Sequence, residues 1–117
     1  MRLSEMEFPE GRPVEGYGPG FVRIGGAVHR GPLLVLPSGV RPWGGWEDVA
    51  GPLAGAGAID ILLVGTGEAM AYLPAPFRAA LEGAGLGVDP MPTPAACRTY
   101  NVLLAEGRRV GLALVPV

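Results

Sequence analysis

The chain has 117 residues, a formal net charge of −2 and hydrophobic residues at 49% of its positions. All of its basic residues are arginine, and apart from Arg108-Arg109 they are scattered, which indicates no basic surface for nucleic acid. No apolar run reaches the roughly 20 residues of a membrane-spanning helix, so we expect no membrane insertion. One cysteine excludes an internal disulfide, and one cysteine with one distant histidine argues against a zinc site.

The N-terminal residues carry no targeting pattern. Residues 1–13 are polar and contain Pro9, Gly11 and Pro13, which predicts a loose arm or one bound at an edge of the fold. The acidic segment from Met1 to Phe8 lacks the apolar stretch of a secretory signal and the basic character of a transit peptide. We therefore expect a cytoplasmic protein whose residues 1–117 form a single domain.

The N-terminal half alternates short apolar segments with glycine and proline, a pattern that is typical of β-strands joined by tight turns. We expect strands over residues 21–24, 27–30 and 33–36, with turns at Gly25-Gly26 and Gly31-Pro32. Together they predict an antiparallel meander, followed by a short extended piece over residues 40–43.

The segment Trp43-Gly-Gly-Trp46 leads into a weak helical turn over residues 46–54, which Gly51-Pro52 limits in length. Its tryptophans have two interpretations. They could expose an aromatic patch for a partner, or they could cover the end of the sheet, which is the commoner outcome.

From residue 59 the pattern becomes strand, helix, strand, helix, strand. The elements are expected over residues 61–64, 74–82, 86–89, 94–106 and 109–115, with Thr93 as the cap of the second helix. Helical crossovers favour parallel pairing, although the last strand could be inverted at an edge. The fold class is α/β, with the β-rich N-terminal half added to the sheet or packed against it.

Two segments follow strands of this sheet, and ligands tend to bind outside the carboxyl ends of parallel strands. They are Gly65-Thr66-Gly67 and the helix start at Thr93. Because the N–H groups of a helix N-terminus attract anions, these residues predict a site for a small anion or a carboxylate. The alternative is that Gly65 and Gly67 only shape a turn and Thr93 only caps its helix.

The helix after Thr93 carries three further polar side chains of interest. Arg98 could clamp a carboxylate, or it could be solvated; Asn101 could line the crevice, or it could tie the helix to adjacent loops. Cys97 is expected to be a buried structural residue, because apolar residues surround it. A nucleophilic role for Cys97 would require the fold to bring it to His29.

Several motifs along the chain resemble those of one known family. They are Gly16-Tyr-Gly18, Phe21-Val-Arg-Ile-Gly-Gly26, Gly31-Pro-Leu-Leu-Val-Leu-Pro-Ser-Gly-Val40, Leu63-Val-Gly-Thr-Gly67, Thr93-Pro-Ala-Ala-Cys-Arg-Thr-Tyr-Asn-Val-Leu-Leu104 and Glu106-Gly-Arg-Arg-Val110. The sequence is similar to the small Mth-like domain family, whose members include the mitochondrial complex I assembly factor and the adipogenesis-associated Mth-like protein. The resemblance implies a three-layer α/β fold around a central mixed sheet, and it implies no established catalysis.

Two functions of different classes follow. The first is a non-catalytic binding or assembly factor, whose protein partner would belong to a membrane respiratory complex, as the resemblance implies. The second is a small-anion or carboxylate binder, or an enzyme, that uses Gly65, Thr66, Gly67, Thr93, Arg98 and Asn101. We expect no cofactor, no metal and no nucleic acid, and short apolar edge strands in the N-terminal half would allow a homodimer.

Overall fold

The computed structural model describes residues 11–117, so most of the expected N-terminal arm lies outside the described residues. The first three strands form a small antiparallel sheet of their own. They are β1 (Val14–Gly18), β2 (Phe21–Ile24) and β3 (Ala27–Arg30), paired in the order β1-β2-β3. Gly25 and Gly26 connect β2 to β3 with φ angles of 60° and 78°. This left-handed conformation suits a two-residue hairpin turn and costs little at glycine.

The second sheet is mixed and has five strands. They are β4 (Leu33–Leu36), β5 (Gly39–Pro42), β6 (Ile61–Thr66), β7 (Gly87–Met91) and β8 (Val110–Val115), in the order β5-β4-β8-β6-β7. β6 pairs in parallel with both β7 and β8, whereas β4 pairs antiparallel with β5 and β8. The last strand therefore lies inside the sheet, parallel to β6.

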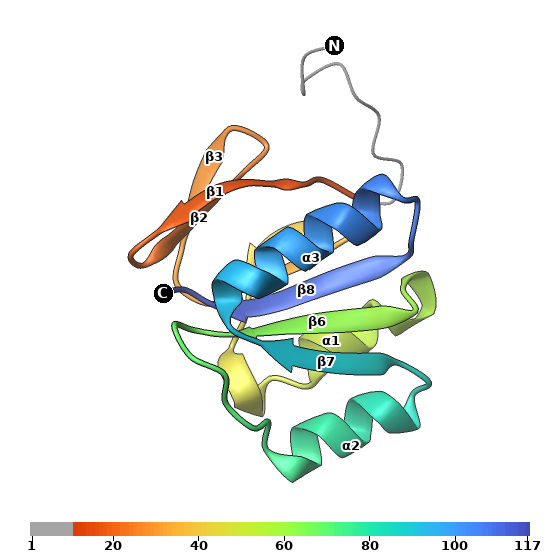
Figure 1. Ribbon diagram of the computed structural model, residues 1–117. Coiled ribbons are helices and arrows are strands. Elements are labelled where there is room, and N and C mark those ends of the chain that lie inside the picture. The colour runs from red at the N-terminus through yellow and green to blue at the C-terminus, as the bar shows by residue number, and fades with distance from the viewer. Residues whose placement is uncertain (1–10) are drawn as a thin grey trace.

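The helices lie on opposite faces of this sheet, as Figure 1 shows. On one face lie α3 (Thr93–Ala105) and the sheet β1-β2-β3. On the other lie α2 (Ala75–Gly83), the short α1 (Ala50–Ala54) and two single 3₁₀ turns, η2 (Gly45–Glu47) and η3 (Ala56–Ala58). The predicted three-layer α/β fold with a central mixed sheet is confirmed.

Each face of the central sheet has its own hydrophobic core, and β4 shows how the two are built. Leu33 and Val35 pack with Tyr100 on the α3 side, whereas Leu34 and Leu36 pack with Phe77 on the α2 side. Successive side chains of a strand point to opposite faces, so all four residues of β4 are buried. A strand covered on both faces reads as a continuous apolar run, which is the pattern of residues 33–36.

Three local expectations need correction. The meander does not continue from β3 into β4, because β4 needs cover on both faces and pairs with β8 instead. The structure adds β1, whose Gly16 and Gly18 hid its strand character from the sequence. Thr93 does not cap α3: Pro92 holds the cap position without a side-chain bond, and Thr93 is the first helical residue.

Within residues 11–117, no helix combines the length and the apolar character needed to cross a bilayer.

Candidate functional site

Thr93 joins the ends of three elements at the predicted strand-end site. Its side chain is fully buried, with 0% exposure. The Thr93 hydroxyl accepts the Gly67 N–H at 2.8 Å and donates to the Val115 carbonyl at 2.7 Å, while the Thr93 N–H donates to the Gly67 carbonyl at 2.8 Å. These bonds tie α3 to the ends of β6 and β8.

Gly65 allows the close approach of α3. A Cβ on Gly65 would stand 2.7 Å from the Thr93 hydroxyl oxygen and 2.9 Å from the Leu114 Cβ, so no larger residue fits without displacing α3. Thr66 makes internal contacts as well: its hydroxyl lies 2.6 Å from the Ala69 carbonyl oxygen and 3.2 Å from that of Met91.

The first turn of α3 offers few N–H groups to an anion. Thr93 uses its own on Gly67, Pro94 has none, and Ala96 donates to the Pro92 carbonyl at 2.9 Å. Ligand binding by Gly65, Thr66, Gly67 and Thr93 stays a prediction, and the contacts of their polar groups given above are internal ones.

Arg98 and Asn101 do not lie next to Thr93 at the predicted strand-end site. They stand five and eight residues along α3, which corresponds to about 7.5 and 12 Å along the helix axis. Arg98 is exposed. The Asn101 amide donates to the Val14 carbonyl at 2.8 Å and accepts the Val14 N–H at 2.8 Å, so Asn101 ties α3 to β1.

Cys97 is buried in the core on the α3 side, as expected. Burial raises the pKa of its thiol to about 11, more than the nearby Arg98 charge lowers it. Because the thiolate is the nucleophile, we predict that a disulfide reagent at pH 8 leaves Cys97 unlabelled in the folded protein and labels it fully in denaturant. Rapid labelling under native conditions would contradict this burial.

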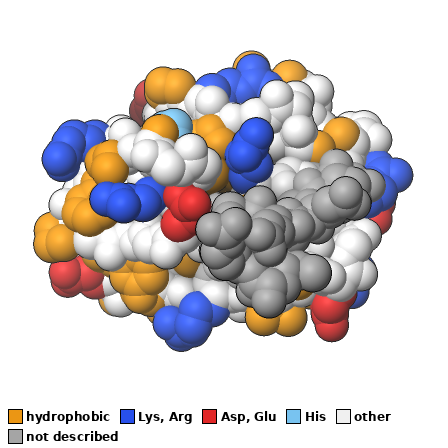
Figure 2. Space-filling view, turned by 90° about the horizontal axis from the view of Figure 1, so that it is seen from above, with side chains coloured by type: hydrophobic (Ala, Val, Ile, Leu, Met, Phe, Trp, Pro, Cys, Tyr) orange, Lys and Arg blue, Asp and Glu red, His pale blue; other side chains and the backbone are white. Residues whose placement is uncertain are grey.

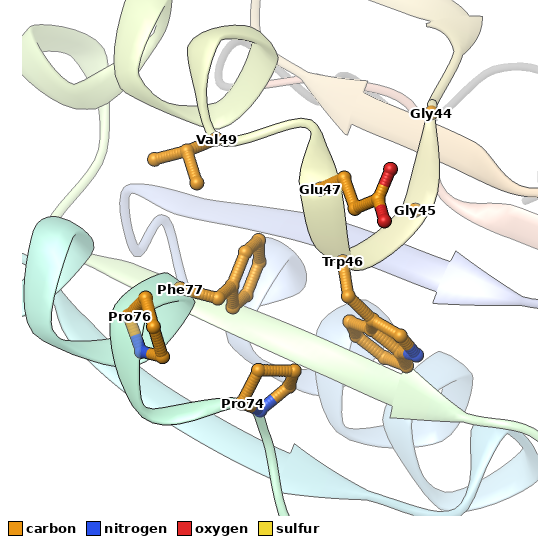
Figure 3. Close-up of a pocket in the computed structure, with 8 residues that line it drawn as sticks. All are labelled: Gly44, Gly45, Trp46, Glu47, Val49, Pro74, Pro76 and Phe77. Atoms are coloured by element: carbon orange, nitrogen blue, oxygen red, sulfur yellow. The ribbon is translucent and has the colours of Figure 1, made fainter.

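The opposite face of the sheet carries an open cavity, here called the aromatic pocket. Its volume is about 720 Å³, and its lining residues are Gly44, Gly45, Trp46, Glu47, Val49, Pro74, Pro76 and Phe77. Figure 3 shows the side chains of Trp46, Val49, Pro74, Pro76 and Phe77 around this space, with η2 on one side and the start of α2 on the other. Most of its lining is apolar, and Glu47 supplies its charged group.

Three aromatic rings pack together at this pocket: Trp46 and Phe77 line it, and Trp43 lies behind them in the core. The Trp43 and Trp46 rings meet edge-on at 5.2 Å, and the Phe77 ring lies 5.8 Å from each of them. Trp43 is 4% exposed and covers the sheet, which was the commoner outcome expected for this segment. Trp46 is half-buried, so part of its ring faces the pocket.

Asp48 holds the loop that presents Trp46. Its carboxylate accepts the N–H of Gly51 at 2.9 Å and that of Gly44 at 3.0 Å, and its carbonyl accepts the Trp43 indole N–H at 3.0 Å. The bonds from Gly51 and then Gly44 lower the pKa of Asp48 below its ordinary value, with a smaller contribution from the Arg41 charge. A carboxylate bonded in this way fixes the entry into α1.

We predict that Asp48→Asn lowers the free energy of unfolding by about 1 kcal/mol at pH 7, because the amide has one oxygen where the carboxylate has two. The folded pKa lies below the unfolded value of 3.8. The stability supplied by the charge is therefore present above pH 3.8 and is lost as the pH falls through the folded pKa. Urea unfolding followed by tryptophan fluorescence should show the difference between the two proteins shrinking below pH 3.8, and a constant difference would contradict the assignment.

The sequence prediction missed the aromatic pocket as a site, although it singled out one of its walls. Trp43-Gly-Gly-Trp46 was recognised, but the partner wall, Pro74-Ala-Pro-Phe77, was interpreted only as a helix start. Among the residues that the structure describes, no three His, Cys, Asp or Glu side chains lie together as metal ligands would.

Comparison with known proteins gives a consistent result. Residues 14–115 match the family described as protein of unknown function (DUF498/DUF598). An uncharacterized protein of Rhodobacter capsulatus is 50% identical over 117 residues, which are all of this chain and 94% of that protein. Mouse NADH dehydrogenase (ubiquinone) 1 alpha subcomplex assembly factor 3 is 34% identical over 122 residues, which cover 97% of this chain. The chain spans 65% of that mouse protein's length.

Solved structures of similar proteins share the fold. The crystal structure of a protein described as an outer membrane protein from Bartonella henselae has a TM-score of 0.85 and 37% identity, and covers 95% of this chain and 99% of that one. The solution structure of a Bordetella pertussis protein, described as a Mth938-like domain, has a TM-score of 0.77 and 29% identity. The match covers 99% of this chain and 92% of that one.

Proposed function

The chain belongs to the family of proteins of unknown function DUF498/DUF598, which confirms the predicted Mth-like membership, and from this premise we propose that it is an assembly-factor-like protein. It would act by binding another protein, and the partner would be a component of a respiratory complex. The observation that carries the proposal is the 34% identity to the mouse NADH dehydrogenase assembly factor over 97% of this chain.

The aromatic pocket supports a binding role. Protein interfaces are enriched in tryptophan, phenylalanine and other large apolar side chains at their buried centres. The half-buried Trp46 supplies such a ring at a surface opening, the buried Phe77 ring packs against it, and Asp48 holds the loop that carries Trp46. A surface that is held in place in this way loses little conformational entropy when a partner binds.

The proposal is tested in cells from which the gene has been deleted. If the protein assists assembly of the NADH dehydrogenase complex, native gels should show several-fold less assembled complex, and the gene returned on a plasmid should restore it. The level of a second respiratory complex in the same membranes is the control. An unchanged amount of assembled NADH dehydrogenase would overturn the proposal.

The second function, a small-anion or carboxylate site at Gly65–Gly67 and Thr93, stays a prediction. Titration with inorganic phosphate and acetate, observed through the amide signals of Gly67 and Ala95, would test it directly. Shifts confined to these signals would support the site.

A further inference from the structure

The walls of the aromatic pocket offer an apolar surface with few polar groups. Trp46, Val49 and Phe77 present carbon to the space, and Pro74 and Pro76 have no N–H to give to an anion. The exposed Glu47 carboxylate is the charged group of the lining. The lining therefore suits an apolar group that stands next to a positive charge, because both Glu47 and the ring faces attract cations.

The charged residues near the pocket also favour a positively charged partner. The loop over residues 44–49, on one wall of the pocket, carries Glu47 and Asp48 and no basic residue, and Arg78, which follows Phe77, pairs with Glu82 at 3.5 Å. Residues 11–43 and 91–117 carry seven arginines and two glutamates, whereas residues 78–90 carry Arg78, Glu82 and Asp89. Figure 2 looks onto the α3 side and shows several arginine side chains spread over it. Complementary charge steers partners to matching faces, so the pocket side favours a basic partner.

The apolar surface extends beyond the pocket, which argues for a chain segment as its occupant. Tyr72 is 94% exposed and Met70 is 50% exposed. Tyr72 stands two residues before Pro74, so their Cα atoms lie within about 7 Å of each other. A small molecule that fills the pocket would leave these side chains in water, whereas an extended peptide could cover them as well.

We propose that the aromatic pocket binds a short segment of a partner protein that carries an apolar side chain next to arginine or lysine. The inference rests on the proposed function, since it names the kind of segment that the assembly-factor-like protein would hold. The apolar side chain would pack against the exposed part of the Trp46 ring, Val49 and Pro74, and the basic side chain would pair with Glu47.

The experiment is a selection of short random peptides, displayed on phage, against the purified full chain. We expect the enriched peptides to share an apolar residue beside arginine or lysine. A synthetic copy of the most enriched peptide is then the probe for titration. Enrichment of acidic peptides, or of no common pattern, would overturn the inference.

Variants of the pocket decide where the probe binds. Trp46→Ala should weaken the probe about 30-fold, as expected for an aromatic side chain at the centre of an interface. Because Trp46→Ala also removes a ring that packs against Trp43, Glu47→Arg provides a second variant, at an exposed position. We expect Glu47→Arg to bind the probe about 5-fold more weakly than the unmodified protein, and we expect added salt to make this difference smaller. Val102→Ala, at an exposed residue of α3, should change nothing.

The outcomes separate this inference from the proposed function. Binding that is unaffected by both Trp46→Ala and Glu47→Arg places the probe elsewhere and overturns the inference, whatever the deletion strain shows. Pocket-dependent binding together with normal assembly of NADH dehydrogenase would retain the inference and reject the respiratory role.

Discussion

Replacing Thr93 by valine is expected to lower the free energy of unfolding by about 3 kcal/mol, although the two side chains have nearly the same shape. The fully buried Thr93 hydroxyl satisfies the buried Gly67 N–H and the partly buried Val115 carbonyl. Valine would leave the buried Gly67 N–H unpaired, at about 1–3 kcal/mol, and would remove a bond from the partly buried Val115 carbonyl, at about 1 kcal/mol.

Two control variants isolate the hydroxyl as the cause. Thr93→Ser keeps the hydroxyl and removes one methyl group, so it should cost only about 1 kcal/mol. Thr99→Val makes the same change at a half-buried position of α3 and should be nearly neutral. Urea unfolding followed by tryptophan fluorescence measures all three. If Thr93→Val costs no more than Thr93→Ser, the Thr93 bonds do not hold the strand ends together.

Replacing Asn101 by alanine is expected to cost about 2.5 kcal/mol and to loosen the sheet β1-β2-β3 from α3. The Asn101 amide makes two bonds to the Val14 backbone, and the Tyr100 hydroxyl adds a bond to the Arg12 carbonyl at 2.9 Å. Within residues 11–117 the small sheet shares no strand pairing with the central sheet. These side chains, the apolar contacts of Val14, Val22 and Ile24, and the bond from the Gly20 N–H to the Val117 carbonyl at 2.8 Å therefore hold it.

Amide hydrogen exchange distinguishes local loosening from a uniform loss of stability. Asn101→Ala should speed exchange in β1 and β2 more than in β6 and β8, because local opening has its own free energy. Tyr100→Phe, which removes one bond and keeps the ring, should produce a smaller change of the same kind. Equal acceleration in both sheets would contradict a specific link through Asn101.

The sequence predicted the central layers well because their residues follow strong rules. The buried run Leu33–Leu36, the strand 61–64 and the two proline-started helices appear within one or two residues of their expected bounds. The partner of each strand was harder, since no local pattern distinguishes β4 pairing with β3 from β4 pairing with β8. The deciding factor is burial on both faces, which depends on the whole fold.

The candidate site was harder still, because its meaning depends on contacts across the chain. Thr93 reads locally as a helix cap, but its hydroxyl serves β6 and β8. The aromatic pocket joins residues 44–49 to residues 74–77, which no spacing rule connects. The Trp43-Gly-Gly-Trp46 segment was the one local signal, and its role became visible only beside Phe77.

Photo-cross-linking in native cells tests the central claim most directly. A photoreactive phenylalanine derivative is placed at Tyr72, beside the aromatic pocket, or at Tyr17 of β1 as the matched aromatic control. We predict that position 72 cross-links to a subunit of NADH dehydrogenase or its assembly intermediates, and that position 17 does not. Such cross-links from position 17 alone, or none from position 72, would contradict the account.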